Sequence, residues 1–318
     1  SRYQAIRRAP VCVPYQQFRV CGMRPPSSGG LTVGQILMML DQFEIGGRQD
    51  DDTRRRYHLY VEVAKRAFAD RALYMADADF VSVPSDALLD ADYLADRAGE
   101  INPNTATIGP ARAGSWPAET LGQTQAADPK QQDSGTTHFV VVDHDGNVIS
   151  YTGSIESAFG SRQMVHGILL NNQLTDFSFR ATADDGTLIA NRVQPGKRPR
   201  SSMAPTIVFD GTDRPILAVG SPGGSRIINY VAMAVVNMLG LGLSPGEAFA
   251  APHLGSRNGP VEAELGAVDP MMIEGLRAAG HEVRLQPMVS GLHGVFITSG
   301  QLLGGADPRR EGHVEGLP

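Results

Sequence analysis

The spacing of hydrophobic residues predicts two helices in the first quarter of the chain. Residues 22–30 contain two adjacent prolines and a glycine pair, which favour a loop, and the apolar run from Val33 to Leu40 then predicts a short helix. From Asp52 to about Tyr74, apolar residues recur at intervals of three and four, namely Tyr57, Tyr60, Val61, Ala64 and Phe68. This period predicts a second, amphipathic helix with one face against a core.

A segment without any period separates these helices from a predicted hairpin. Residues 101–135 are rich in Pro, Gly, Thr, Ala and Gln, and this composition indicates a linker. Directly after it, Thr137 to Val142 alternates between apolar and polar positions as a strand does. Residues 143–147 carry the turn sequence DHDGN, and a second strand-like run follows from Val148 to Tyr151. We therefore expect a β-hairpin immediately after the linker.

Later patterns predict that the second part of the chain mixes helices with a substantial sheet. Short strand-like runs occur at Ile168–Leu170, Thr206–Phe209, Ile216–Val219 and Val295–Thr298. Helical patterns lie between them at Arg226–Leu239 and Met271–Ala279. Strands and helices that alternate in this way indicate a sheet with helices packed on it.

Composition and charge narrow the class of protein. The 318 residues suffice for one large domain or two smaller ones, and 42% hydrophobic with 19% charged residues indicates neither disorder nor a coiled coil. A net charge of -6 and a pI near 5.7 offer no basic surface for nucleic acid or anionic membrane. No apolar run approaches the roughly 18 residues of a membrane helix. A small-molecule substrate is therefore expected.

The first residues and the cysteines leave the compartment open. The chain starts at Ser1 without an initiator Met or a secretory signal pattern, and it reads as a piece of a longer protein. Cys12 and Cys21 are too few for a disulfide framework and lack the spacing of metal ligands. We expect both to be structural thiols, because free cysteine behaves mainly as a small buried hydrophobe.

Common cofactor and metal signatures are absent. The sequence contains no H-E-x-x-H, G-x-S-x-G, P-loop or C-x-x-C motif. Residues 143–147 resemble the start of a calcium-binding loop, but Ser154 stands where such a loop needs a bidentate glutamate. These absences exclude the most familiar metal and cofactor sites.

Four polar clusters lie beside strand-like runs, where loops present side chains to a cleft. They are residues 134–138 (SGTTH), 170–177 (LNNQLTDF), 199–205 (PRSSMAP) and 220–226 (GSPGGSR). Each alone fits an ordinary turn or loop. In this order and at these separations, however, the set resembles the small subunit of gamma-glutamyltransferases.

The resemblance covers residues 136–318, including Ala306–Arg309, and it continues upstream of the linker. Residues 25–30 (PPSSGG) and Ala69–Arg71 are similar to the C-terminal part of the family's large subunit. The resemblance implies an α+β fold, the four-layer αββα sandwich of N-terminal-nucleophile hydrolases. It also divides the chain into residues 1–135, which belong to the large subunit, and residues 136–318, the catalytic small subunit.

Self-cleavage between Gly135 and Thr136 is the step that the resemblance implies first. Family members are made as one precursor that cuts itself before the first threonine of a Thr-Thr-His motif. A threonine hydroxyl is a poor nucleophile without a base, and the new α-amine of Thr136 supplies that base on the same residue. Ser154 occupies the place of a family threonine that hydrogen-bonds the nucleophile, and it keeps the hydroxyl.

The resemblance also assigns the groups that bind the substrate. The main-chain N–H groups of Gly223 and Gly224 correspond to the donors that stabilise the oxyanion. The α-amine of a γ-glutamyl group corresponds to acidic and amide side chains, and its α-carboxylate to hydroxyls. The amine ligands are Glu156, Gln173 and Asp176, and the carboxylate ligands are Ser201 and Ser202.

Two departures from the family pattern concern arginines. The family binds the α-carboxylate mainly through an arginine of the early large subunit, and this chain does not contain that region. Arg200 stands where leucine is expected; its side chain either tunes the pocket or points to solvent, and we favour solvent.

The implied reaction transfers the γ-glutamyl group of glutathione to Thr136 as an ester, and then to water, an amino acid or a peptide. The two subunits of one precursor form a heterodimer, and family habit implies a periplasmic or extracellular location. One alternative is a cephalosporin or glutaryl acylase of the same family, which keeps the nucleophile and changes the acyl pocket. The other is an inactive fragment that lacks the early large subunit.

Overall fold

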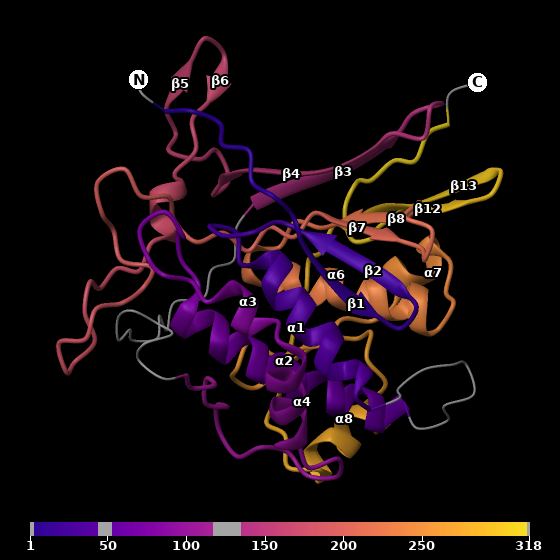
Figure 1. Ribbon diagram of the computed structural model, residues 1–318. Helices are drawn as coiled ribbons and strands as arrows, with labels where there is room; N and C mark the ends of the chain where they lie inside the picture. The colour runs from indigo at the N-terminus through magenta and orange to yellow at the C-terminus, as the bar shows by residue number, and fades with distance from the viewer. Residues whose placement is uncertain (1–2, 44–52, 117–134, 317–318) are drawn as a thin grey trace.

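The computed structural model of the protein describes residues 3–43, 53–116 and 135–316. Its centre is an antiparallel sheet of six strands in the order β1, β2, β7, β8, β12, β13 (Figure 1). Strands β1 and β2 precede residue 135, and the other four follow it. Their bounds are β1 (Val11–Tyr15), β2 (Phe18–Gly22), β7 (Thr206–Phe209), β8 (Pro215–Gly220), β12 (His293–Thr298) and β13 (Gln301–Ala306).

Strands β2 and β7 form the seam between the two parts of the chain. Arg19 lies opposite Phe209, Val20 opposite Val208, and Cys21 opposite Ile207. The segments before and after residue 135 therefore share one sheet.

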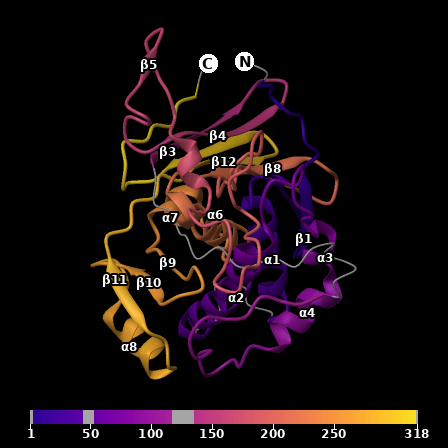
Figure 2. The same cartoon turned by 90° about the vertical axis from the view of Figure 1, so that its left-hand side faces the viewer.

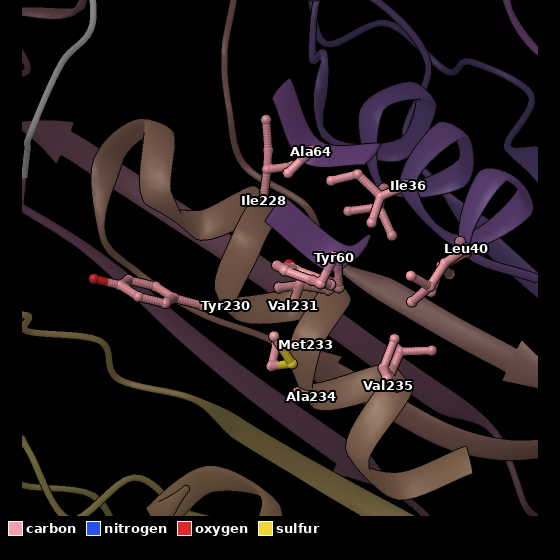
Figure 3. Packing of buried hydrophobic residues seen from close by; sticks show 14 of the residues in the cluster. Ile36, Leu40, Tyr60, Ala64, Ile228, Tyr230, Val231, Met233, Ala234 and Val235 are labelled. Atoms are coloured by element: carbon pink, nitrogen blue, oxygen red, sulfur yellow. The ribbon is translucent and has the colours of Figure 1, made fainter. Parts of the chain in front are cut away.

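Helices α1 (Gly29–Asp41) and α6 (Ile227–Val235) cover one face of this sheet, and α2 (Thr53–Tyr74) packs on α1. Figure 3 shows side chains from all three helices in one cluster of buried hydrophobic residues: Ile36, Leu40, Tyr60, Ala64, Ile228 and Val231. Both α1 and α6 are apolar almost all round, which is typical of helices buried on several sides. The Tyr60 hydroxyl donates to the main-chain oxygen of Asn229 at 3.0 Å, so its polar atom is satisfied.

A hairpin covers the opposite face of the sheet. Strands β3 (Gly135–Val142) and β4 (Val148–Glu156) confirm the predicted hairpin and contact β8 and β12. The His138 ring lies over Gly220, where a Cβ atom would come within 2.3 Å of it. The hairpin therefore approaches the sheet closely at this point.

The outer face of the hairpin is apolar and exposed. It carries Phe139, Val141, Ile149 and Tyr151, and the rings of Phe139 and Tyr151 stack with their centroids 4.9 Å apart. No helix covers this face within residues 3–43, 53–116 and 135–316 (Figure 1). The described residues thus form a helix layer, a six-stranded sheet and a hairpin, in an α+β arrangement.

A smaller unit at residues 254–286 packs on α2. Its strand β10 (Val261–Glu264) pairs with β9 (Leu254–Gly255) and with β11 (Val283–Gln286), and helix α8 (Pro270–Ala278) lies beside them (Figure 2). Buried Val61 of α2 belongs to the same hydrophobic cluster as residues of this unit. The unit therefore shares apolar contacts with the helix layer.

Three further helices complete the described helices. They are α3 (Ser85–Leu88), α4 (Ala91–Gly99) and α7 (Pro245–Ala250). Asp90 caps α4 by accepting from the Tyr93 N–H, and Ser244 and Glu247 form a capping box at α7.

Little regular structure is present between the hairpin and β7. Residues 157–200 contain only β5 (Met164–Val165), β6 (Ile168–Leu169) and a 3₁₀ turn, η1 (Gln173–Asp176). The strand predicted at Ile168–Leu170 is thus a two-residue, largely exposed pairing. The predicted linker shows no regular structure over residues 101–116, and its residues 117–134 lie outside the described residues.

The prediction that the cysteines are free thiols is wrong. Cys12 and Cys21 form a disulfide between β1 and β2. The reason is register, because the short turn between these strands places Cys12 directly opposite Cys21. Neither strand was predicted from the apolar pattern, so this pairing was not predicted either.

Candidate active site

Thr136 lies at the start of β3, beside an irregularity in the strand pairing. Its hydroxyl donates to the Ser154 hydroxyl at 3.2 Å, and Ser154 lies directly opposite it on β4. Ser154 in turn donates to the main-chain oxygen of Gly135 at 2.8 Å. The ladder register shifts between Gly135 and Thr136, a feature that re-aims side chains next to active sites. A relay of two hydroxyls therefore links Thr136 to the carbonyl of the peptide bond that precedes it.

A glycine pair between β8 and α6 presents two main-chain N–H groups. The φ angles of Gly223 and Gly224 are 133° and 59°, and a Cβ at Gly223 would come within 2.6 Å of the Tyr230 ring. Neither N–H donates a hydrogen bond to another group in the described part of the chain. A 3₁₀ turn from Gly224 to Arg226 leads directly into α6, so these groups lie at a helix N-terminus. Such a terminus favours an anion.

Thr136 and Gly224 line one small pocket with most of the predicted substrate ligands. The pocket combines hydroxyls, an amide, a carboxylate and two guanidinium groups. Its lining residues are Arg71, Thr136, Ser154, Gln173, Asp176, Arg200, Ser201, Ser202, Met203, Gly224, Ser225 and Ile227. Gly223 is not among these lining residues, and it lines a second pocket together with Gly135.

One side of the pocket is acidic. Gln173 and Asp176 are the first and last residues of η1, and the Gln173 amide donates to the Asp176 carboxylate. The Asn191 side chain donates to the main-chain oxygen of Asp176 at 2.8 Å and holds this turn in place. Two of the three predicted amine ligands therefore reach the pocket.

Glu156, the third predicted amine ligand, does not line the pocket. It is buried at the end of β4 with a φ of 72°. Its carboxylate accepts from the Ser157 hydroxyl at 2.6 Å and from the Asn172 amide. In this arrangement Glu156 holds the loop that carries η1 through Asn172, a contact that motif spacing alone does not show.

The pocket lining also includes a second group, Ser201, Ser202 and the two arginines, which we call the serine side. Arg71 was not predicted to line the pocket, although it belongs to the Ala69–Arg71 segment that carries the family resemblance. The expectation that Arg200 points to solvent is wrong, because only 5% of its surface is exposed. The Arg200 guanidinium donates to the main-chain oxygen of Arg71 at 3.1 Å, and its main-chain N–H donates to Asn191. A carbonyl near the end of α2 therefore draws Arg200 inward.

His138 does not act as an acid or base near neutral pH. Burial, and the nearby His293 to a lesser degree, lowers the pKa of His138 to about 3. Its Nδ1 atom pairs with the Thr152 hydroxyl at 2.8 Å, while Nε2 has no partner within the described residues. The imidazole is therefore neutral and lies within the layer between hairpin and sheet.

No group of residues suited to hold a metal ion occurs in the described parts of the chain. The same residues contain no helix that is long and apolar enough to cross a membrane. The described residues of the candidate site provide a relayed hydroxyl, a pair of N–H donors and a pocket with both signs of charge.

Comparisons with known proteins identify similar sequences and structures. The family model described as gamma-glutamyltranspeptidase matches residues 1–317. A glutathione hydrolase proenzyme of Bacillus subtilis (strain 168) is 35% identical over 100% of this chain and 54% of its own length. The chain thus spans about half the length of the curated relatives that it matches.

Two solved structures extend the comparison. A cephalosporin acylase from Bacillus halodurans has a TM-score of 0.78 and 25% identity over 96% of this chain and 53% of its own. A gamma-glutamyltranspeptidase from Pseudomonas nitroreducens, complexed with L-DON, has a TM-score of 0.52 and 30% identity. The match covers 100% of that chain and 57% of this one. Residues 136–318 make up about the same share of this chain.

Proposed function

The chain belongs to the gamma-glutamyltranspeptidase family, and we propose that its protein is a self-processing gamma-glutamyltransferase and glutathione hydrolase with Thr136 as nucleophile. One observation carries the proposal. The Thr136–Ser154–Gly135 hydroxyl relay and the N–H groups of Gly223 and Gly224 adjoin a pocket with both signs of charge.

Self-processing uses the relay. The Thr136 hydroxyl adds to the carbonyl carbon of Gly135, the C–N bond breaks, and an ester and a free α-amine form. Water then hydrolyses the ester, which leaves a carboxylate on Gly135 and restores the Thr136 hydroxyl. The hydrogen bond from Ser154 to the Gly135 oxygen, 2.8 Å long, polarises the carbonyl during attack.

Turnover then uses the amine that processing exposes. An α-amine titrates near 7.7–8.0 when unperturbed, so it accepts the proton of its own side chain near neutral pH. The hydroxyl attacks the γ-carbonyl, and the oxyanion binds the N–H groups of Gly223 and Gly224. The C–N bond of the γ-amide then breaks, and the released amine leaves with the proton. Water or an amino acid then takes the acyl group from the ester.

The pocket favours a γ-glutamyl over a purely apolar acyl group. Asp176 and Gln173 on one side suit an ammonium group, while Ser201 and Ser202 on the other suit a carboxylate. Glutathione is the expected donor. The similarity to a cephalosporin acylase keeps the acylase alternative open to test, since a glutaryl group lacks the ammonium that the acidic side would bind.

Compartment and assembly follow from the same proposal. Both cysteines of the chain are joined in a disulfide, a bond that persists in oxidising compartments, and this supports a periplasmic or extracellular location. Cleavage before Thr136 would divide the precursor into a large and a small subunit that remain together as a heterodimer.

The test uses the full-length protein. Wild type should give two bands on a denaturing gel, and the smaller band should begin with Thr-Thr-His. It should release 4-nitroaniline from γ-glutamyl 4-nitroanilide much faster than from glutaryl 4-nitroanilide. The T136A variant should give one band and no release. An uncut protein with full activity, or a preference for the glutaryl substrate, would reject the proposed function.

A further inference from the structure

Arg71 connects the core to the serine side of the pocket. Only 5% of its surface is exposed, and it lies three residues before the end of α2. Its Nε atom donates to the Ser28 hydroxyl at 2.8 Å, and its Nη2 atom donates to the Ser202 hydroxyl at 2.6 Å. The guanidinium also lies over the Phe68 ring, 5.7 Å from its centroid. Three contacts thus fix the position of this cation.

The contact with Ser202 determines what that hydroxyl can do. An arginine only donates, so the Ser202 oxygen accepts and its single proton is directed to another group. Within the described residues Ser202 donates that proton to no other group. Since Ser202 lines the pocket, its hydroxyl is set as a donor toward an acceptor bound there.

The loop before α1 holds Ser201 in place through hydrogen bonds. Ser28 accepts from Arg71, and both its hydroxyl and its main-chain N–H donate to the main-chain oxygen of Ser201, at 2.7 and 2.8 Å. The Ser201 N–H donates to the oxygen of Pro26 at 3.0 Å. The two upstream segments that the resemblance includes, residues 25–30 and Ala69–Arg71, therefore meet at this one point of the pocket.

The carboxylate next to Arg71 in sequence faces a different set of groups. Asp70 accepts from Gln35 at 2.9 Å, from the Tyr93 hydroxyl at 2.7 Å and from the Gly114 N–H at 2.8 Å. Its ion-pair partner is Arg97, at 3.7 Å. Asp70 and Arg71 therefore have different roles. Asp70 links α2 to α4, and Arg71 contacts Ser202 in the pocket.

We propose that Arg71 is a positioning and specificity-determining residue for the α-carboxylate of the γ-glutamyl group. It sets the Ser202 hydroxyl as a donor and adds positive charge to the pocket beside Ser202. The inference rests on the proposed function and adds to it a residue upstream of the cut. Residues 136–318 alone would therefore lack part of the carboxylate site.

The test compares two substrates on each variant of the full-length, processed protein. One is γ-glutamyl 4-nitroanilide, and the other is 4-aminobutyryl 4-nitroanilide, in which hydrogen replaces the α-carboxylate. R71Q should lower the ratio of kcat/KM for the γ-glutamyl substrate to kcat/KM for the 4-aminobutyryl substrate by roughly 10- to 100-fold. The change should come mainly from a higher KM for the γ-glutamyl substrate. R71K should recover part of the ratio, because it keeps the charge and loses the two-pronged donation.

A buried arginine of similar exposure provides the matched control. R97Q removes a cation that pairs with Asp70 and Glu100 and does not line the pocket. It should lower stability and leave the substrate ratio unchanged. Because the ratio is taken on one preparation, the fraction of active enzyme cancels.

Two outcomes would overturn the inference. The first is R71Q that loses activity toward both substrates equally, which would assign Arg71 to the core alone. The second is an unchanged ratio in S28A, because loss of the hydrogen bond between Ser28 and Arg71 should lower the ratio several-fold. If R71Q does not mature, S28A and R71K are compared with wild type instead. A wild-type protein inactive on γ-glutamyl 4-nitroanilide would instead reject the proposed function itself.

Discussion

The two sides of the pocket are built in different ways. The serine side is fixed by buried groups, since Ser28 and Arg71 hold Ser201 and Ser202 through hydrogen bonds that begin in the helix layer. The acidic side lies in the irregular segment 157–200, where Leu174, between Gln173 and Asp176, is 73% exposed. One side is thus an extension of the core, and the other is a turn held by Glu156 and Asn191 through a few side-chain contacts.

This difference indicates where mutations could change substrate specificity with the least effect on folding. A mutation on the serine side disturbs α2 and the loop before α1, so it affects folding together with binding. A mutation on the acidic side changes a residue in an exposed loop, so it should alter binding with little loss of stability. Acyl-group specificity within such a fold should therefore vary first on the acidic side.

The largest effect is expected at the glycine pair, whose N–H groups are the proposed oxyanion donors. G223A forces a side chain into a backbone with φ of 133° and against the Tyr230 ring, so its N–H should move. We expect kcat to fall by roughly 10²–10³ for γ-glutamyl and glutaryl substrates alike. Steady-state kinetics on both substrates checks this. A loss confined to one substrate would contradict a shared oxyanion site.

A change on the acidic side should separate the substrates. D176N removes the charge that the ammonium group would bind, and kcat/KM for γ-glutamyl 4-nitroanilide should fall roughly 100-fold. The same variant should process normally and keep its low rate on glutaryl 4-nitroanilide, which lacks the amine. A melting temperature close to that of wild type would support the loop-borne character of this side, and a large drop would contradict it.

A change behind the serine side should instead appear in stability. The C12S/C21S double variant removes the cross-strand disulfide next to the loop that clamps Ser201. We expect the free energy of unfolding to fall by roughly 2 kcal/mol, because the unfolded chain loses a constraint. Denaturant unfolding with and without reductant measures this. Wild type that is insensitive to reductant would argue against the disulfide.

The smallest effect should come from pH. Burial lowers the pKa of His138 to about 3 and that of His281 to about 4, against an ordinary value of 6.5. The unfolded chain therefore binds more protons below pH 6.5, so stability is complete above that pH and declines as pH falls toward 4. Each histidine should contribute about 1 kcal/mol of loss between pH 7 and 5.5.

Unfolding curves across that range, for wild type and for H281N, give the slope of stability with pH. The variant should show a shallower slope, because one of the two groups is gone. Identical slopes would show that His281 titrates normally in the folded protein.

The sequence predicted those parts of the fold that a local period encodes. The helix from Asp52 and the hairpin after residue 135 followed directly from apolar spacing, and the run Thr206–Phe209 has the same bounds as β7. Strands β1 and β2 are five residues each and were missed, and with them the disulfide, because pairing across a turn is a matter of register.

The candidate site was predictable as far as motifs reach. Six of the predicted side chains line one pocket with Gly224, while Gly223 lines a second pocket. Glu156 and Arg200 departed from expectation for one reason. Their positions depend on partners far along the chain or in another loop, namely Asn172 for Glu156 and the Arg71 carbonyl for Arg200. No spacing rule within a single motif contains that information.

The pairing of β2 with β7 has a consequence for a cut chain. After the proposed scission before Thr136, the two polypeptides would remain neighbours within one continuous ladder of hydrogen bonds. Dilution alone should then not separate them, since parting the pieces would demand melting the domain. Reassembly from denatured, separated pieces would become a bimolecular reaction whose yield rises with protein concentration, whereas the uncut precursor would recover by a unimolecular route.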